Sequence, residues 1–118
     1  MSDSFQGSSI ITVQPGDHSS SYTFTFAACS SATANDGSLP YGTTIASCVT
    51  TAYNEAGTDS TTLLVYTESL TTPVVTVGLK WPTTAGRYSL EFVITLSSGS
   101  VMEFDFTRIY ALDISAAR

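Results

Sequence analysis

Positively charged residues are almost missing from this 118-residue chain, which has four Lys and Arg against ten Asp and Glu. The four bases are dispersed at Lys80, Arg87, Arg108 and Arg118, and the formal net charge is −6. A nucleic-acid interface needs clustered Lys and Arg to neutralise phosphates, so the sequence argues against a nucleic-acid partner. The same acidity would repel an anionic membrane surface.

Long apolar segments are also missing. No stretch of the sequence approaches the roughly 20 apolar residues of a membrane-spanning helix. The first four residues, Met-Ser-Asp-Ser, lack the basic start and the apolar run of a signal peptide. We therefore expect a protein that is made in the cytoplasm and has no membrane partner.

Cysteine and histidine are scarce, which limits metal and nucleophile chemistry. Cys29 and Cys48 are the only cysteines, and both are out of phase with the large apolar residues beside them. Without an export signal, two free thiols are favoured, and one disulfide is the alternative. His18 is the only histidine and follows Asp17 in a polar turn, where a solvated side chain is favoured over a catalytic or metal-binding one.

Hydroxyl groups supply the polarity that charge does not. The chain has 18 Ser and 19 Thr, whereas charged residues make up 12%. The branched Cβ of Thr suits strands, and Ser suits turns. A chain of this length fits one domain with a hydrophobic core of its own.

A strict alternation of apolar and polar residues between positions 86 and 114 is the strongest structural signal. The apolar positions are Tyr88, Leu90, Phe92, Ile94 and Leu96, and then Met102, Phe104 and Phe106. The polar positions between them include Ser89, Glu91, Thr95, Glu103, Asp105 and Thr107. A period of two gives each strand one apolar face, and the Ser/Gly segment 97–100 joins the two strands as an antiparallel hairpin.

Five further segments carry strand signals. They are residues 10–14, 20–28, 43–53, 62–67 and 74–81. With the hairpin they predict seven strands with turn signals about every 8–12 residues, which is typical of an immunoglobulin-like antiparallel β-sandwich with Greek-key connections. The pattern places Ile45, Val49 and Tyr53 on one face of their strand, and Trp81 at one end of the core.

The ends and one loop are expected to serve assembly. We expect one sandwich domain over residues 10–114, an N-terminal arm at 1–9 and a C-terminal tail at 115–118. Such Ser/Gly-rich, apolar-poor arms can order against a neighbouring subunit. The segment 30–42 is predicted to be a long loop, and long loops in compact domains tend to be binding or ordering elements.

Two groups of acidic residues give weak chemical signals. Glu103 and Asp105 share a strand face at a spacing of about 7 Å, and paired carboxylates can support glycoside hydrolysis. With Glu91 expected opposite them, a solvated face or an acidic interface patch is favoured. Arg87 and Arg108 could form surface ion pairs of small energetic value with these acids.

The second group, Asn35-Asp36-Gly37, resembles part of a calcium loop but lacks the further ligands and the closing Glu. A turn in which Asn35 and Gly37 accept a left-handed backbone is favoured. No glycine-rich phosphate-binding motif is present in the sequence. The sequence therefore predicts no catalytic residue, no cofactor and no metal site.

Two central segments are apolar on both faces. Leu63 and Val65 alternate with Leu64 and Tyr66, and the strand at 74–79 has Val on both faces. A sandwich needs only one apolar face per sheet. The extra apolar area therefore indicates either a protein interface or a central strand beneath a loop.

Two strand patterns together resemble a known group. GTTIAS at residues 42–47 fits a G-x-TI-x-S strand, and the hairpin opens with a G-x-Y-x-L-x-F-x-I strand and ends in acidic and aromatic residues. The matching positions are Gly42, Thr44, Ile45 and Ser47, and then Gly86, Tyr88, Leu90, Phe92 and Ile94. These patterns resemble small immunoglobulin-like virion structural proteins of tailed bacteriophages, over about residues 15–112.

The resemblance implies a non-enzymatic protein of the virion, assembled in the host cytoplasm. The leading hypothesis is a capsid decoration (cement) protein that binds the outer capsid surface in several copies and stabilises capsomer contacts. Its partner would be the major capsid protein or another virion protein. The alternative is a neck or tail adaptor that links the connector to tail fibres. A third hypothesis is a carbohydrate-binding sandwich in which Tyr41, Tyr53, Tyr66 or Trp81 stacks on sugar rings.

Overall fold

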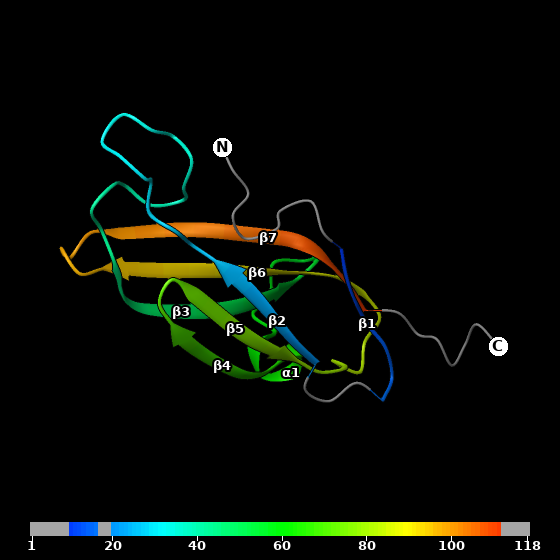
Figure 1. The fold of residues 1–118 in the computed structure, drawn as a ribbon. Helices are drawn as coiled ribbons and strands as arrows, with labels where there is room; N and C mark the ends of the chain where they lie inside the picture. The colour runs from blue at the N-terminus through cyan, green and yellow to red at the C-terminus, as the bar shows by residue number, and fades with distance from the viewer. Residues whose placement is uncertain (1–9, 17–19, 112–118) are drawn as a thin grey trace.

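Strands dominate the computed structural model, which describes residues 10–16 and 20–111 (Figure 1). Within these residues there are seven strands and one short helix. They are β1 (Ile11–Val13), β2 (Ser20–Thr25), β3 (Ile45–Asn54), α1 (Thr61–Leu64), β4 (Val65–Thr71), β5 (Val74–Leu79), β6 (Gly86–Leu96) and β7 (Val101–Ala111). The predicted all-β class is confirmed. The predictions for Asp17, His18, the arm at 1–9 and the tail at 115–118 lie outside the described residues.

The strands form two sheets that pack face to face as a sandwich (Figure 1). The four-stranded sheet has the order β1-β7-β6-β3, and the three-stranded sheet has the order β2-β5-β4. All neighbouring pairs are antiparallel except β1 and β7, which are parallel. At one edge the Thr50 hydroxyl of β3 donates a hydrogen bond to Glu68 of β4, which joins the two sheets.

The predicted hairpin is confirmed as β6 and β7, with one irregularity. Phe92 pairs with Phe104, but Leu90 pairs with Phe106 and Tyr88 pairs with Ile109, so β7 holds one extra residue between them. Such a bulge shifts the alternation by one position. Phe106 and Ile109 can therefore both face the core, where they are 2% and 0% exposed.

A second bulge makes the predicted face of β3 wrong. Ile45 pairs with Leu96 but Ser47 pairs with Thr95, so β3 also gains one residue against β6. Ile45 is buried, yet the residues that face the core beyond the bulge are Thr50 and Ala52. Val49 therefore faces solvent and is 59% exposed.

The strand predicted at 62–67 exists, but its predicted start is wrong, because the chain first makes the helical turn α1. The Asp59 carboxylate accepts hydrogen bonds from the backbone N–H (2.9 Å) and the hydroxyl (2.7 Å) of Thr61. The backbone N–H groups of Leu63 and Leu64 then donate to the carbonyl of Ser60. Such local side-chain bonds compete with strand pairing. The turn buries Leu64 completely and delays β4 to Val65–Thr71.

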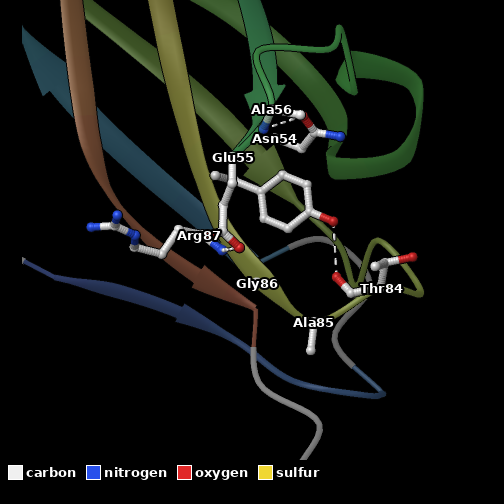
Figure 2. Close-up of a pocket in the computed structure, with 8 residues that line it drawn as sticks. Asn54, Glu55, Ala56, Thr84, Ala85, Gly86 and Arg87 are labelled. Atoms are coloured by element: carbon white, nitrogen blue, oxygen red, sulfur yellow. Dashed lines mark hydrogen bonds between the residues drawn. The ribbon is translucent and has the colours of Figure 1, made fainter.

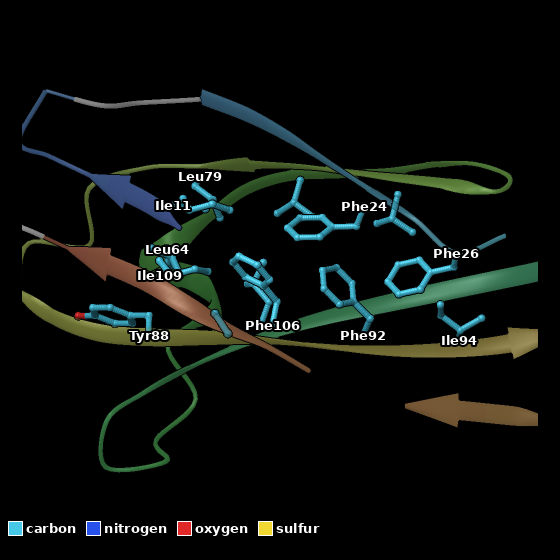
Figure 3. Close-up of a cluster of buried hydrophobic side chains, with 14 of the residues drawn as sticks. Ile11, Phe24, Phe26, Leu64, Leu79, Tyr88, Phe92, Ile94, Phe106 and Ile109 are labelled. Carbon is cyan, nitrogen blue, oxygen red and sulfur yellow. The ribbon is translucent and has the colours of Figure 1, made fainter. Parts of the chain in front are cut away.

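The core is built around phenylalanine rings from both sheets (Figure 3). The ring centroid of Phe24 lies 4.8 Å from that of Phe92 and 5.3 Å from that of Phe106, and Phe26 lies 5.3 Å from Phe92. These tilted and edge-on arrangements are favourable for aromatic pairs and stabilise the contact between the two sheets. Trp81 is partly buried and packs against this cluster.

Candidate functional site

A shallow hollow lies where the turn after β3 meets the start of β6 (Figure 2). Its volume is about 200 Å³, and an adjoining hollow of about 320 Å³ shares Asn54, Glu55, Arg87 and Tyr88. The remaining lining residues are Ala56, Thr84, Ala85, Gly86, Ser89 and Thr107. This hollow could not be predicted from the sequence, because its two walls come from segments about 30 residues apart.

The polar side chains of the hollow form hydrogen bonds mainly with backbone groups. A Glu55 carboxylate oxygen accepts a hydrogen bond from the backbone N–H of Arg87 at 3.3 Å, and a Cβ at position 86 would lie 2.9 Å from that oxygen. The Tyr88 hydroxyl donates to the carbonyl of Thr84 at 2.8 Å. Burial, and then the negative charge of Glu55, raise the pKa of Tyr88, which keeps it a donor. These contacts tie the 80–85 loop and the β3 turn to β6.

The solvent-facing side of the four-stranded sheet has a different chemistry. Val49 of β3 is directly cross-strand from Val93 of β6, which in turn is cross-strand from Glu103 of β7. Val101 lies one row away, opposite Thr95. Val49 and Val101 are 59% and 58% exposed, whereas Val93 is half-buried among its neighbours. Three valines therefore lie on neighbouring positions of a face that does not contribute to the core.

Carboxylates adjoin these valines. Glu91 pairs directly with Asp105, as predicted, and Glu103 lies on the same face two residues before Asp105. The Tyr53 hydroxyl donates a hydrogen bond to a Glu91 carboxylate oxygen at 3.3 Å. Burial, and then the charge of Glu91, raise the pKa of Tyr53, so the phenol stays protonated. We refer to this surface as the valine-carboxylate face; its members are Val49, Val93, Val101, Glu91, Glu103 and Asp105.

The arrangement of Glu103 and Asp105 fits surface acids better than a catalytic pair. Both side chains are exposed on a paired strand, and neither lines either of the two hollows. General acid catalysis requires a carboxyl group whose surroundings favour its protonated form. Within residues 10–16 and 20–111, no group of three or more His, Cys, Asp and Glu could hold a metal ion.

Asp36 closes the 30–42 loop. Its carboxylate accepts hydrogen bonds from the hydroxyl (2.7 Å) and then the backbone N–H (2.9 Å) of Ser30, and both lower the pKa of Asp36. The predicted left-handed backbone at Asn35 and Gly37 is wrong, since neither has a positive φ. Gly37 is required for another reason: a Cβ there would lie 2.6 Å from the carbonyl oxygen of Ala27.

The two cysteines are free, as the sequence favoured. The Cys29 thiol contacts the carbonyl of Gly37 at 3.8 Å. Burial, and then the charge of Glu68, raise the pKa of Cys48 to about 11. A thiol with so high a pKa is a poor nucleophile at neutral pH.

The aromatic residues proposed for sugar stacking have different surroundings. Tyr41 and Tyr66 are 58% and 48% exposed, whereas Tyr53 and Trp81 are partly buried. Tyr66 lies on β4 and Tyr53 on β3, which belong to different sheets.

The two segments that are apolar on both faces differ in how the structure uses their apolar residues. β5 is the central strand of its sheet, with Val75 and Val77 buried on one face and Val74 half-buried on the other. Leu63 and Tyr66 keep 47% and 48% of their surface exposed.

Comparison with known proteins does not assign the chain to a family. No protein-family model, curated protein or solved structure matches the chain. Among the described residues, no helix is long and apolar enough to span a membrane. The likeness to phage proteins therefore rests on the sequence patterns alone.

Proposed function

We propose that this chain is a non-enzymatic virion structural protein, a capsid decoration protein that binds the outer capsid surface and stabilises capsomer contacts. The observation that carries the proposal is the valine-carboxylate face, on which Val49 and Val101 are more than half exposed although the core is complete without them. Exposed apolar residues that adjoin one another on a sheet are typical of a protein contact surface.

The sheet topology supports the immunoglobulin-like part of the proposal. The strands after β1 divide into β2, β4 and β5 on one sheet and β3, β6 and β7 on the other. This division resembles that of the immunoglobulin fold, in which the third, sixth and seventh strands share a sheet. The chain changes sheets between β1 and β2, between β2 and β3, between β3 and β4, and between β5 and β6, and such crossings favour Greek-key connections.

Attachment would depend on area and on copy number. Durable binding of one copy needs an interface of about 1,200 Å² or more, which the outer side of β3, β6 and β7 would share with the neighbouring loops. Many copies on a regular lattice, or one copy that bridges two subunits, add avidity to a modest single-site affinity. Capsomer contacts are then stabilised because the bound state is favoured over the separated subunits.

The proposal is tested by adding the purified chain to virus particles that lack it. We expect saturable binding and a higher temperature of particle disruption. The double variant Val49→Ser/Val101→Ser should bind at least about tenfold more weakly, because burying each valine is worth about 1.5–3 kcal/mol. The control variant Leu63→Ser/Tyr66→Ser removes exposed apolar area from α1 and β4 and should bind like the wild type. Absence of wild-type binding would overturn the proposal.

Copy number separates decoration from the adaptor alternative. On the order of hundreds of copies per particle supports decoration, whereas about a dozen supports a neck or tail adaptor. The carbohydrate-binding alternative draws support from the exposure of Tyr41 and Tyr66. Failure of the purified chain to bind any sugar on a glycan array would exclude that alternative.

A further inference from the structure

Among residues 10–16 and 20–111, no Lys or Arg is the cross-strand partner of Glu91, Glu103 or Asp105 on the valine-carboxylate face. Glu91 is directly cross-strand from Asp105, and Glu103 is on the same face about 7 Å along β7 from Asp105. The other positions on this part of the face carry hydroxyls: Ser47, Thr51, Tyr53, Ser89, Thr95 and Thr107. Arg87 and Arg108 lie at or beyond the bulge, away from the valines.

This placement is unfavourable for the isolated molecule. Like charges directly opposite one another destabilise an antiparallel pair. The hydrogen bond from Tyr53 offsets part of this cost at Glu91, and Asp105 is exposed. A cationic group placed over Glu91 and Asp105 would turn the repulsion into attraction.

The valines restrict which cation fits. Lys and Arg have apolar stems that can lie along Val49, Val93 and Val101 while their charged heads reach the carboxylates. A second copy of this chain does not fit, because it would oppose like charges and the chain carries a net charge of −6. Nucleic acids and anionic lipids are repelled for the same reason.

We propose that the valine-carboxylate face binds a basic protein segment in which Lys or Arg residues flank an aliphatic residue. The proposal rests on the proposed function, since it names the chemistry of the partner at the same surface. The valines provide contact area, and the three carboxylates select a positively charged partner and speed the encounter at low salt.

The test is an NMR titration of the full, isotope-labelled chain with the blocked peptide Gly-Lys-Val-Lys-Val-Lys-Gly. Two matched peptides replace either both Val with Ser or all Lys with Glu. With the Lys-Val peptide we expect chemical-shift changes concentrated on β3, β6 and β7 around the valine-carboxylate face. The Ser peptide should bind at least about tenfold more weakly, and the Glu peptide should not bind. Raising the salt concentration should weaken the Lys-Val interaction.

Two charge variants test whether peptide binding depends on the carboxylates of this face or only on the net charge of the protein. Glu91→Gln/Asp105→Asn should weaken peptide binding about tenfold, whereas Glu55→Gln/Glu68→Gln removes the same charge elsewhere and should leave it unchanged. The Gln side chains of the control keep the acceptors that Arg87 and Thr50 use. A dispersed amide spectrum shows that each variant is folded.

Equal losses in both variants, or shift changes spread over all acidic residues, would overturn the inference. So would equal binding of the Ser and Val peptides. Because the titration uses no virus particle, these outcomes are separate from a failure of the chain to bind particles, which overturns the proposed function.

Discussion

The two faces of the β6–β7 hairpin share one backbone but differ in how completely their side chains are used. The inner face places Phe92, Ile94 and Phe106 in the core with almost no exposed surface. The outer face carries half-exposed valines beside mutually repelling carboxylates. The inner face is therefore accounted for by folding, whereas the outer face retains exposed apolar area and charge that the core does not use.

The largest expected effect is on the inner face. Phe92→Ala should lower the free energy of unfolding by about 3–5 kcal/mol, because it leaves a cavity among tightly packed rings. Val49→Ala on the outer face should change it by no more than about 0.5 kcal/mol. Urea unfolding followed by tryptophan fluorescence measures both. Similar losses for the two variants would abolish the distinction between the faces.

A smaller effect of opposite sign is expected on the outer face. Glu91→Gln/Asp105→Asn should stabilise the free chain by roughly 0.2–1 kcal/mol, because it removes a like-charge pair. The gain should shrink at high salt, where the repulsion is already screened. Thermal unfolding at low and high salt provides the measurement. A loss of stability at low salt would mean that the carboxylates support the fold instead.

The smallest expected effect concerns the 30–42 loop, where the ionised carboxylate of Asp36 stabilises the loop through its hydrogen bonds with Ser30. Hydrogen bonds from the side chain and then the backbone of Ser30 hold the pKa of Asp36 below its ordinary value of 3.8. A depressed pKa contributes stability above the unfolded-state value and loses it as pH falls through the folded-state value. Asp36→Ala should therefore reduce stability at pH 6 and leave it closer to wild type at pH 2.

Melting temperatures recorded between pH 6 and pH 2 test this expectation. Asp59, whose pKa the Thr61 hydroxyl lowers in the same way, serves as the matched site at α1. A constant difference between Asp36→Ala and wild type across this range would show that the Ser30 contact does not depend on ionisation.

The inner face could be predicted from sequence because its signal is local. Tyr88 to Leu96 alternate without interruption, and every second residue is buried as expected. The bulges between Ile45 and Ser47 and opposite Ser89 could not be predicted, since a register depends on both strands of a pair. The alternation alone therefore assigns Val49 to the wrong face. The helical turn had a readable signal in Asp59-Ser60-Thr61, which the alternation of the following leucines obscured.

The candidate site was only partly predictable for the same reason. The shared face of Glu91, Glu103 and Asp105 followed from the hairpin alone. Val93 and Val101 belong to the same hairpin, whereas Val49 required the register of a third strand, β3, which lies more than 30 residues earlier in the chain. The hollow around Glu55 and Arg87 likewise depends on segments that meet only in the folded molecule.

The most direct test of the central claim is a density map of an intact particle that contains this chain. The account predicts that the outer side of β3, β6 and β7 lies against another protein, with Lys or Arg side chains over Glu91 and Asp105. A map in which this side faces solvent, while the chain is held through β4 or another surface, would contradict it.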